Sequence, residues 1–189
     1  GNLRATFGYQ KQLGILIGSD FERITGRLNV NQRFLNDKLI VGLQSSISRV
    51  NQDRPALNDR AGASGDLLGA AYAANPTWPE SALFRPGGSI SINPLNTIAN
   101  SSQVINTNRF LINASAEYKI TDNISAKVNS GFDLSNSDNV SLQSGKLYIP
   151  ANIEDAGLGR FNSLDRTNKT LEVTVNYNKE FDNSNLDVV

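Results

Sequence analysis

Hydrophobic and polar residues alternate along several stretches of the chain. From Arg23 to Phe34 the odd positions are polar or charged, and the even positions are apolar or small except at Gln32. Successive side chains of a β-strand point to opposite faces, so this pattern predicts a strand with one polar and one apolar face. The stretch is also longer than the five or six residues that are usual for globular strands.

The same alternation recurs in six further stretches. Short turn sequences, such as Asn36-Asp37-Lys38 and Thr121-Asp122-Asn123, join the two members of a pair. The predicted strands cover roughly residues 3–9, 23–34, 39–48, 109–120, 124–134, 171–181 and 186–188. The chain is therefore expected to be all-β, with about seven antiparallel strands.

The connections between these strands alternate in length. Within each pair the link has three or four residues, whereas the longer segments 52–105 and 136–166 separate the pairs. Compact domains rarely contain loops beyond about 12–15 residues, but outer-membrane barrels combine tight periplasmic turns with long extracellular loops. We therefore expect residues 1–189 to be part of one membrane-spanning antiparallel β-barrel, with 52–105 and 136–166 as extracellular loops.

The first long segment carries the pattern of a short helix. Small and apolar residues from Ala61 to Ala74 have helix-compatible spacing, and Asn75-Pro76-Thr77-Trp78-Pro79 ends this pattern, because proline cannot continue a helix. Trp78 offers an aromatic face that could stack on a sugar ring, although an anchor for its own loop is the favoured interpretation. Asn93-Pro94-Leu95-Asn96 indicates a further turn.

Aromatic residues cluster near the ends of the predicted strands, on their apolar sides. This placement is typical of the aromatic girdles at membrane interfaces, and a general preference of aromatic residues for strands is the simpler alternative. With periplasmic short turns, the residues near the inner rim are Phe34, Tyr118, Tyr177 and Phe181, and those near the outer rim are Phe7, Tyr9, Phe110 and Phe132.

Composition narrows the classes of function. The 18 basic and 18 acidic residues give a formal net charge of zero, which argues against nucleic-acid binding. The absence of Cys and His excludes a thiol nucleophile, a Ser-His-Asp triad and an ordinary zinc site, so neither an enzyme nor a cofactor is expected. No run approaches the 18 apolar residues of a membrane helix. The chain contains no Met and begins at Gly1 without a visible signal peptide, so we expect a processed product or a piece of something longer.

The polar sides of the predicted strands carry cations interleaved with amides and carboxylates. In a barrel these side chains would face the lumen and contact a polar solute or an internal plug, because a charge facing mid-bilayer would cost about 2–4 kcal/mol. For any single residue, a cross-strand pair that only holds its neighbours is the favoured role. The lumen- or plug-facing candidates are Arg23, Arg27, Asn29, Asn31, Arg33, Arg109, Asn113, Glu117, Lys127, Asn129 and Glu172.

One stretch of the chain combines Asp and Asn residues that offer oxygen ligands. Asp133, Asn136, Asp138 and Asn139 have a spacing faintly like that of a calcium loop. The complete pattern is missing, and stretches rich in Asp and Asn are usually turns. No metal site and no catalytic residue are therefore expected in the chain.

Several short sequence words occur in a characteristic order between Leu3 and Leu95. They are Gly8-Tyr9, Gln12, Gly14-Ile15, Ser19, Phe21, Arg23, Arg27-Leu28-Asn29, Asn75-Pro76-Thr77-Trp78-Pro79 and Asn93-Pro94-Leu95. In order and spacing these words resemble the early barrel of SusC/RagA-like TonB-dependent transporters. From Arg109 onward only the strand rhythm continues the resemblance.

This resemblance implies an importer in the outer membrane of Bacteroidota that takes up a glycan oligosaccharide or a peptide. The family has a 22-stranded barrel with an N-terminal plug, a SusD-like lipoprotein on its extracellular side, and uptake driven by TonB from the periplasm. Neither a plug nor a TonB box is identifiable in this chain, so membrane lipid and the remaining strands of its own barrel are further expected partners. A secreted or cell-surface β-sandwich or adhesin domain is the alternative, and it explains the Asn-rich strands equally well but the loop rhythm less well.

Overall fold

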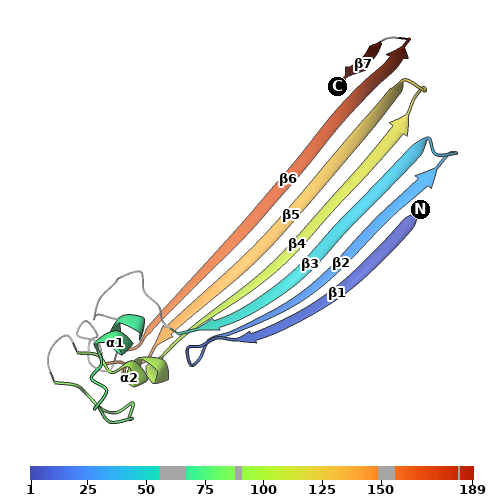
Figure 1. The fold of residues 1–189 in the computed structure, drawn as a ribbon. Coiled ribbons are helices and arrows are strands. Elements are labelled where there is room, and N and C mark those ends of the chain that lie inside the picture. Colours follow the sequence, from blue (N-terminus) through green and yellow to red (C-terminus); the bar gives the residue numbers. More distant parts are fainter. Residues whose placement is uncertain (56–66, 88–90, 149–155, 183) are drawn as a thin grey trace.

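In the computed structural model, the chain forms one antiparallel sheet with two short helices beyond one of its ends (Figure 1). The structure describes residues 1–55, 67–87, 91–148, 156–182 and 184–189. The strands are β1 (Asn2–Leu13), β2 (Asp20–Phe34), β3 (Leu39–Arg54), β4 (Ser101–Lys119), β5 (Ile124–Gln143), β6 (Leu158–Phe181) and β7 (Ser184–Val188). The helices are α1 (Leu67–Ala73) and α2 (Pro94–Asn100).

Every strand pairs with its neighbour in the sequence. The order across the sheet is β1-β2-β3-β4-β5-β6-β7, and all six pairings are antiparallel. The expectation of an all-β chain with about seven antiparallel strands is therefore confirmed. Five of the strands have 15 to 24 residues, and β1 has 12.

Both long connections are shorter than the sequence pattern predicted. The first runs over residues 55–100 instead of 52–105, and the second over 144–157 instead of 136–166, because β5 and β6 continue into the predicted loop. The predicted bounds were wrong for a physical reason. From Asn136 to Asn139 every residue is polar, so both faces of the strand look alike and the alternation that reveals a strand is absent.

The register gives the sheet one apolar face. Residues directly opposite each other share a face, and one such row across the sheet is Leu3, Val30, Leu43, Ala114, Ser130 and Leu171. We call the side of this row the apolar face. It comprises the odd positions of β1, β3 and β6 and the even positions of β2, β4 and β5, and the opposite side is called the polar face.

The sheet is a single layer (Figure 1). Many side chains of its apolar face are exposed. Phe7 and Val173, on strands at opposite sides of this face, are 77% and 67% exposed. In the described part of the chain, the buried hydrophobic residues are Leu67, Ala70, Ile92 and Leu147, and none of them is on a strand. The hydrophobic core of the described residues is thus confined to the long connections.

Two helices lie in the first long connection. The short helix expected within residues 61–74 is present as α1, although residues 61–66 lie outside the described part of the chain. The turn predicted at Asn93-Pro94-Leu95-Asn96 is wrong, because α2 begins there. The Asn93 side chain accepts a hydrogen bond from the Leu95 N–H and caps the helix, and Pro94 occupies the first turn, where its missing N–H costs nothing.

Candidate functional site: the polar face of the sheet

The eleven predicted lumen-facing residues lie on one face. The register assigns each of them to the polar face: five on β2, three on β4, two on β5 and one on β6. For example, Glu117 lies directly opposite Lys127, and Asn129 lies opposite Glu172. This shared facing follows from strict period-2 alternation that runs through long strands without interruption.

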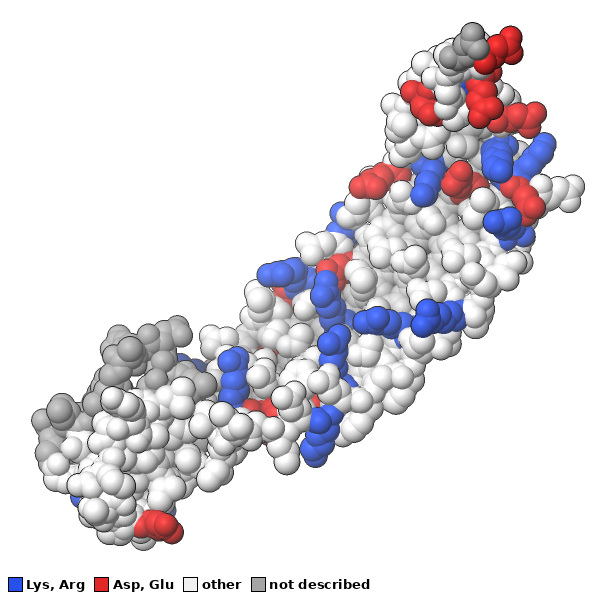
Figure 2. Space-filling view, viewed as in Figure 1, with Lys and Arg blue, Asp and Glu red and all other residues white. Residues whose placement is uncertain are grey.

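Charge is unevenly distributed over the polar face, although the chain as a whole is neutral. Figure 2 shows Lys and Arg side chains across the middle of the sheet, with Asp and Glu gathered mainly nearer the short turns. On β4 to β7 both signs occur on the polar face: Arg109, Lys119, Lys127, Arg160 and Arg166 with Glu117, Asp133, Glu172, Glu180 and Asp187. On β1 to β3 the charged residues of this face are all arginines: Arg4, Arg23, Arg27, Arg33 and Arg54.

One ion pair of ideal geometry spans β4 and β5. Arg109 donates hydrogen bonds to both carboxylate oxygens of Asp133, with distances of 2.8 Å from Nε and 2.7 Å from a terminal nitrogen. Such a two-pronged contact fixes both side chains. The favoured structural role, a cross-strand pair, is therefore realised at Arg109.

A polar hollow of about 260 Å³ lies over Gly42. Its walls include the predicted residues Asn31, Asn113, Lys127 and Asn129. A β-carbon on Gly42 would lie 2.7 Å from the Ser115 hydroxyl oxygen and 3.1 Å from the Asn31 side-chain oxygen, so these polar side chains close over the glycine and a larger residue would displace them. The sequence pattern did not reveal this hollow, because it depends on neighbours three strands apart.

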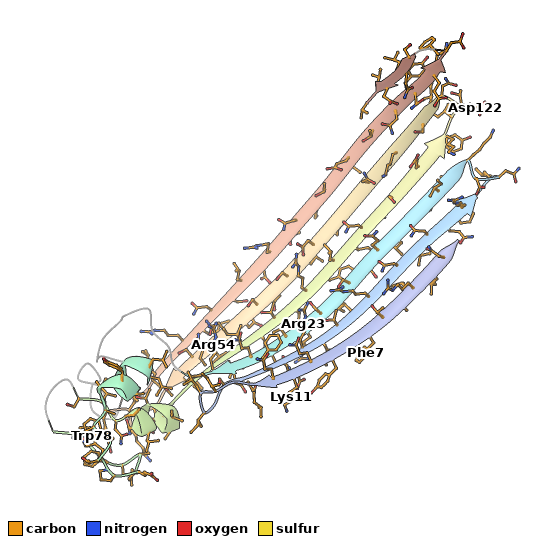
Figure 3. The ribbon with its side chains drawn as sticks, in the orientation of Figure 1. Phe7, Lys11, Arg23, Arg54, Trp78 and Asp122 are labelled. Atoms are coloured by element: carbon orange, nitrogen blue, oxygen red, sulfur yellow. The ribbon has the colours of Figure 1, made fainter. Side chains whose placement is uncertain are left out.

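A second hollow, of about 370 Å³, lies over Gly8 at the β1–β2 pair. Arg23 and Arg27 line it together with Thr25, which is directly opposite Gly8. The Arg23 Nε donates a hydrogen bond of 3.2 Å to the Thr25 hydroxyl oxygen, and this contact holds the guanidinium along β2 beside the hollow (Figure 3). Two predicted cations therefore share one concave surface.

Trp78 lies away from the polar face, in the first long connection (Figure 3). Its ring packs on Phe84 with a centroid distance of 5.8 Å, and it is partly buried. Asn75 forms the turn before it by accepting hydrogen bonds from the Thr77 N–H and hydroxyl. These contacts agree with the favoured interpretation of Trp78 as an anchor of its own loop.

Two buried asparagines tie the connections together, and the sequence pattern missed their role. The Asn96 amide donates to the carbonyl oxygens of Ala82 and Lys146, and its side-chain oxygen accepts from the Tyr148 N–H. Asn93 donates to the carbonyl oxygens of Ser81 and Phe84. The one available signal was the Asn-Pro step that starts α2, and it does not reveal contacts 50 residues away.

The faint calcium pattern at residues 133–139 does not assemble a site in the described part of the chain. Asp133 is on the polar face and bound to Arg109, whereas Asp138 is on the apolar face and accepts a hydrogen bond from the Ser163 hydroxyl. Within the described ranges, no group of three Asp, Glu, His or Cys residues is close enough to hold a metal ion. Among the same residues, no helix has the length and apolar character needed to cross a membrane.

No protein-family model matches the chain, and no curated protein matches it at a significant level.

Proposed function

We propose that the chain is a membrane-embedded part of an outer-membrane importer of the SusC-like, TonB-dependent class. The observation that carries the membrane assignment is the apolar face, which continues across six long strands without any described layer to cover it. Soluble proteins rarely expose apolar patches beyond a few hundred Å². Lipid is the cover that best fits a face whose central rows are mainly apolar or small, while the opposite side carries mainly polar residues.

The edge of the apolar surface crosses the strands obliquely, which supports a tilted arrangement in a membrane. In the row of Tyr9, β6 presents Asp165, and apart from the isolated Phe161 the apolar residues of β6 on this face begin six residues later, at Leu171. Six residues span about 20 Å, and the five strand spacings between β1 and β6 span about 24 Å. The resulting tilt of about 40° agrees with the 35–45° typical of transmembrane barrels.

The height of the apolar surface also fits a membrane. On β4, Phe110 and Tyr118 are the aromatic residues at its two ends, eight residues apart on the same face. Eight residues extend about 26 Å along a strand, and a tilt of about 40° reduces this to about 20 Å. Adding the rings themselves gives a height close to the apolar band of about 25 Å in outer-membrane barrels.

The outer strands leave backbone groups for further partners. β1 pairs on one side with β2, and β7 covers only Tyr177 to Phe181 of the 24-residue β6. An open edge cannot remain unpaired in lipid, because each unsatisfied N–H or C=O group would cost several kcal/mol. We therefore propose that other strands of the same polypeptide complete a closed barrel of about 22 strands.

The import function and the partners TonB and SusD are proposed from the sequence resemblance. In this proposal the barrel takes up a glycan oligosaccharide or a peptide, a SusD-like lipoprotein caps it, and residues 55–100 and 144–157 form part of the extracellular surface. Residues 67–87 and 91–100 offer ordered contacts rather than a loose linker, since Asn93 and Asn96 join them to one another and to Lys146. Exposed apolar side chains such as Tyr72 and Leu83, 94% and 78% exposed, suit a docking surface.

A secreted or cell-surface β-sandwich is the alternative, because a second sheet would also cover the apolar face. Strands of 15 to 24 residues argue against it, since sandwich strands have about five or six. Fractionation of cells that produce the complete polypeptide separates the two proposals. Extraction from the outer membrane only by detergent, with a gel mobility that changes on heating, supports the barrel, whereas a soluble monodisperse product would contradict it.

A further inference from the structure

The polar face of β1 and β2 concentrates arginines that lack acidic partners. Arg4, Arg23 and Arg27 make no ion pair within 4 Å with any carboxylate of the described residues. Arg33, on the same strand as Arg23 and Arg27, is 3.9 Å from Asp37, and Arg109 is held by Asp133. Arg4, Arg23 and Arg27 therefore differ from Arg33 and Arg109, each of which has a carboxylate within 4 Å.

Two of these arginines, Arg23 and Arg27, line one concave surface, and Arg4 is a diagonal neighbour of Arg27 in the register. Arg27 lies opposite Thr6, and Arg4 lies opposite Asn29, so Arg4 and Arg27 are diagonal neighbours across β1 and β2. Arg23 and Arg27 line the hollow of about 370 Å³ over Gly8, together with the hydroxyl-bearing Thr6 and Thr25. Like charges at such spacing repel one another unless an anion lies between them.

The side chains that line the hollow determine which ligand groups it can bind. A guanidinium group offers paired N–H donors in the geometry of a carboxylate, sulfate or phosphate group. The threonine hydroxyls can donate to or accept from the hydroxyl groups of the same ligand. A volume of about 370 Å³ is in the range of small-ligand pockets and is more than a single side-chain carboxylate needs.

We propose that the Gly8 hollow binds the anionic group of a diffusible solute, such as a uronic acid unit or a sulfated sugar. This inference deepens the proposed function, on which it rests, because it names an acidic class of solute for the importer. The excess of arginine on β1 to β3 would also raise the local concentration of such solutes. An acidic side chain from the same polypeptide is the competing occupant.

The test uses the complete polypeptide purified in detergent, titrated with glucuronate and, as its neutral match, glucose. At low salt we expect glucuronate to bind at least ten-fold more tightly than glucose, and this preference to decrease as salt rises. Arg23→Gln and Arg27→Gln should each reduce glucuronate affinity about ten-fold or more. Arg33→Gln, the same change on the same strand and face but outside the hollow, should leave the affinity within two-fold. Inorganic sulfate should compete with glucuronate.

A second variant fills the hollow without changing its charge. A β-carbon on Gly8 would have as its nearest neighbour the Thr25 carbonyl oxygen at 4.0 Å, so Gly8→Val fits the strand while occupying the space. It should reduce glucuronate affinity as strongly as the arginine variants. Assembly of each variant is checked by heat-modifiable gel mobility, and if one arginine variant fails to assemble, Gly8→Val decides.

Three outcomes would overturn the solute proposal. They are equal binding of glucuronate and glucose, an equal loss in Arg33→Gln, and absence of solute binding together with a lower thermal transition in Arg23→Gln. The last outcome would identify an internal acidic side chain as the occupant. Fractionation tests the proposed function separately, since glucuronate binding by a protein outside the outer membrane would refute the importer and leave the site intact.

Discussion

Arg109 and Asp133 are joined by two parallel hydrogen bonds across β4 and β5, although they are not directly opposite each other. Arg109 faces Ser135 in the register and Asp133 faces Leu111, so the pair is diagonal. The pair binds one strand to the next and removes Arg109 from the set of cations that could attract a solute. The polar face thus carries one cation held in a structural ion pair, Arg109, and other cations without such a pair, for example Arg23 and Arg27.

The first prediction concerns this diagonal pair. Asp133→Asn and Arg109→Gln should each lower the thermal transition of the assembled protein, and the double variant should be no worse than the more damaging single variant, because both changes remove the same contact. Glu172→Gln is the control, as no ion pair within 4 Å involves it among the described residues. Strictly additive effects would show that the pair contributes nothing as a unit.

A second prediction tests the facing of the strands. We expect single cysteines at Leu28, Val30, Ile112, Val128 and Val173 to be protected by lipid, and single cysteines at Arg27, Asn29, Asn113, Lys127 and Glu172 to react with a small hydrophilic thiol reagent, less where a plug covers them. The chain itself contains no cysteine, so each label reports one position. Equal labelling of the two sets would contradict the assignment of the apolar face to lipid.

A third prediction measures the cost of a charge on the apolar face. Val128 lies near the middle of the apolar stretch of β5, which runs from Ile124 to Leu134. Val128→Arg should lower the free energy of unfolding in lipid by about 2–4 kcal/mol, the cost of an arginine at mid-bilayer. Asn129→Arg, one residue further and on the polar face, is the matched control and should change it little. Comparable losses in both variants would argue against a membrane on one side.

The fourth prediction concerns the contact between the two long connections. Asn96 is 1% exposed and satisfies two carbonyl groups and one N–H group, so Asn96→Ala leaves buried polar groups unpaired and should destabilise this region by about 1–3 kcal/mol. Limited proteolysis of intact cells should then cut residues 67–87 faster. Asn100→Ala removes one hydrogen bond to the Asn96 carbonyl oxygen and should have a smaller effect.

The fifth prediction tests the docking surface. Tyr72→Ser combined with Leu83→Ser should reduce co-purification of the lipoprotein partner, because it removes exposed apolar contact area without disturbing the buried asparagines. Glu80→Ser, an exposed change in the same connection, should leave co-purification unaltered. Deletion of residues 63–74 separates docking from a lid: lost co-purification with an assembled barrel supports docking, and unchanged co-purification with altered solute leakage supports the lid.

The sequence predicted the sheet well where its two faces differ. From Ile24 to Phe34 the contrast between apolar and polar positions determines both the strand and its facing, because a one-residue slip would exchange the faces. From Ser135 to Asn139 and from Asp165 to Thr170 every residue is polar on both faces, so the alternation disappears and the strand ends could not be located. The hollow over Gly8 was also unpredictable, because it depends on which residue of β2 lies opposite that glycine.

The pairing of each strand with its neighbour in the sequence has a consequence for the kinetics of assembly. β4 and β5 meet through the four residues 120–123, and hairpins of this kind form within microseconds. β3 and β4 instead meet across residues 55–100, and closing this loop costs about 2 kcal/mol more in chain entropy. We therefore expect folding to start from two separate nuclei, β1 to β3 and β4 to β7. We expect the pairing of β3 with β4, in which Arg54 lies opposite Gln103, to be the slowest.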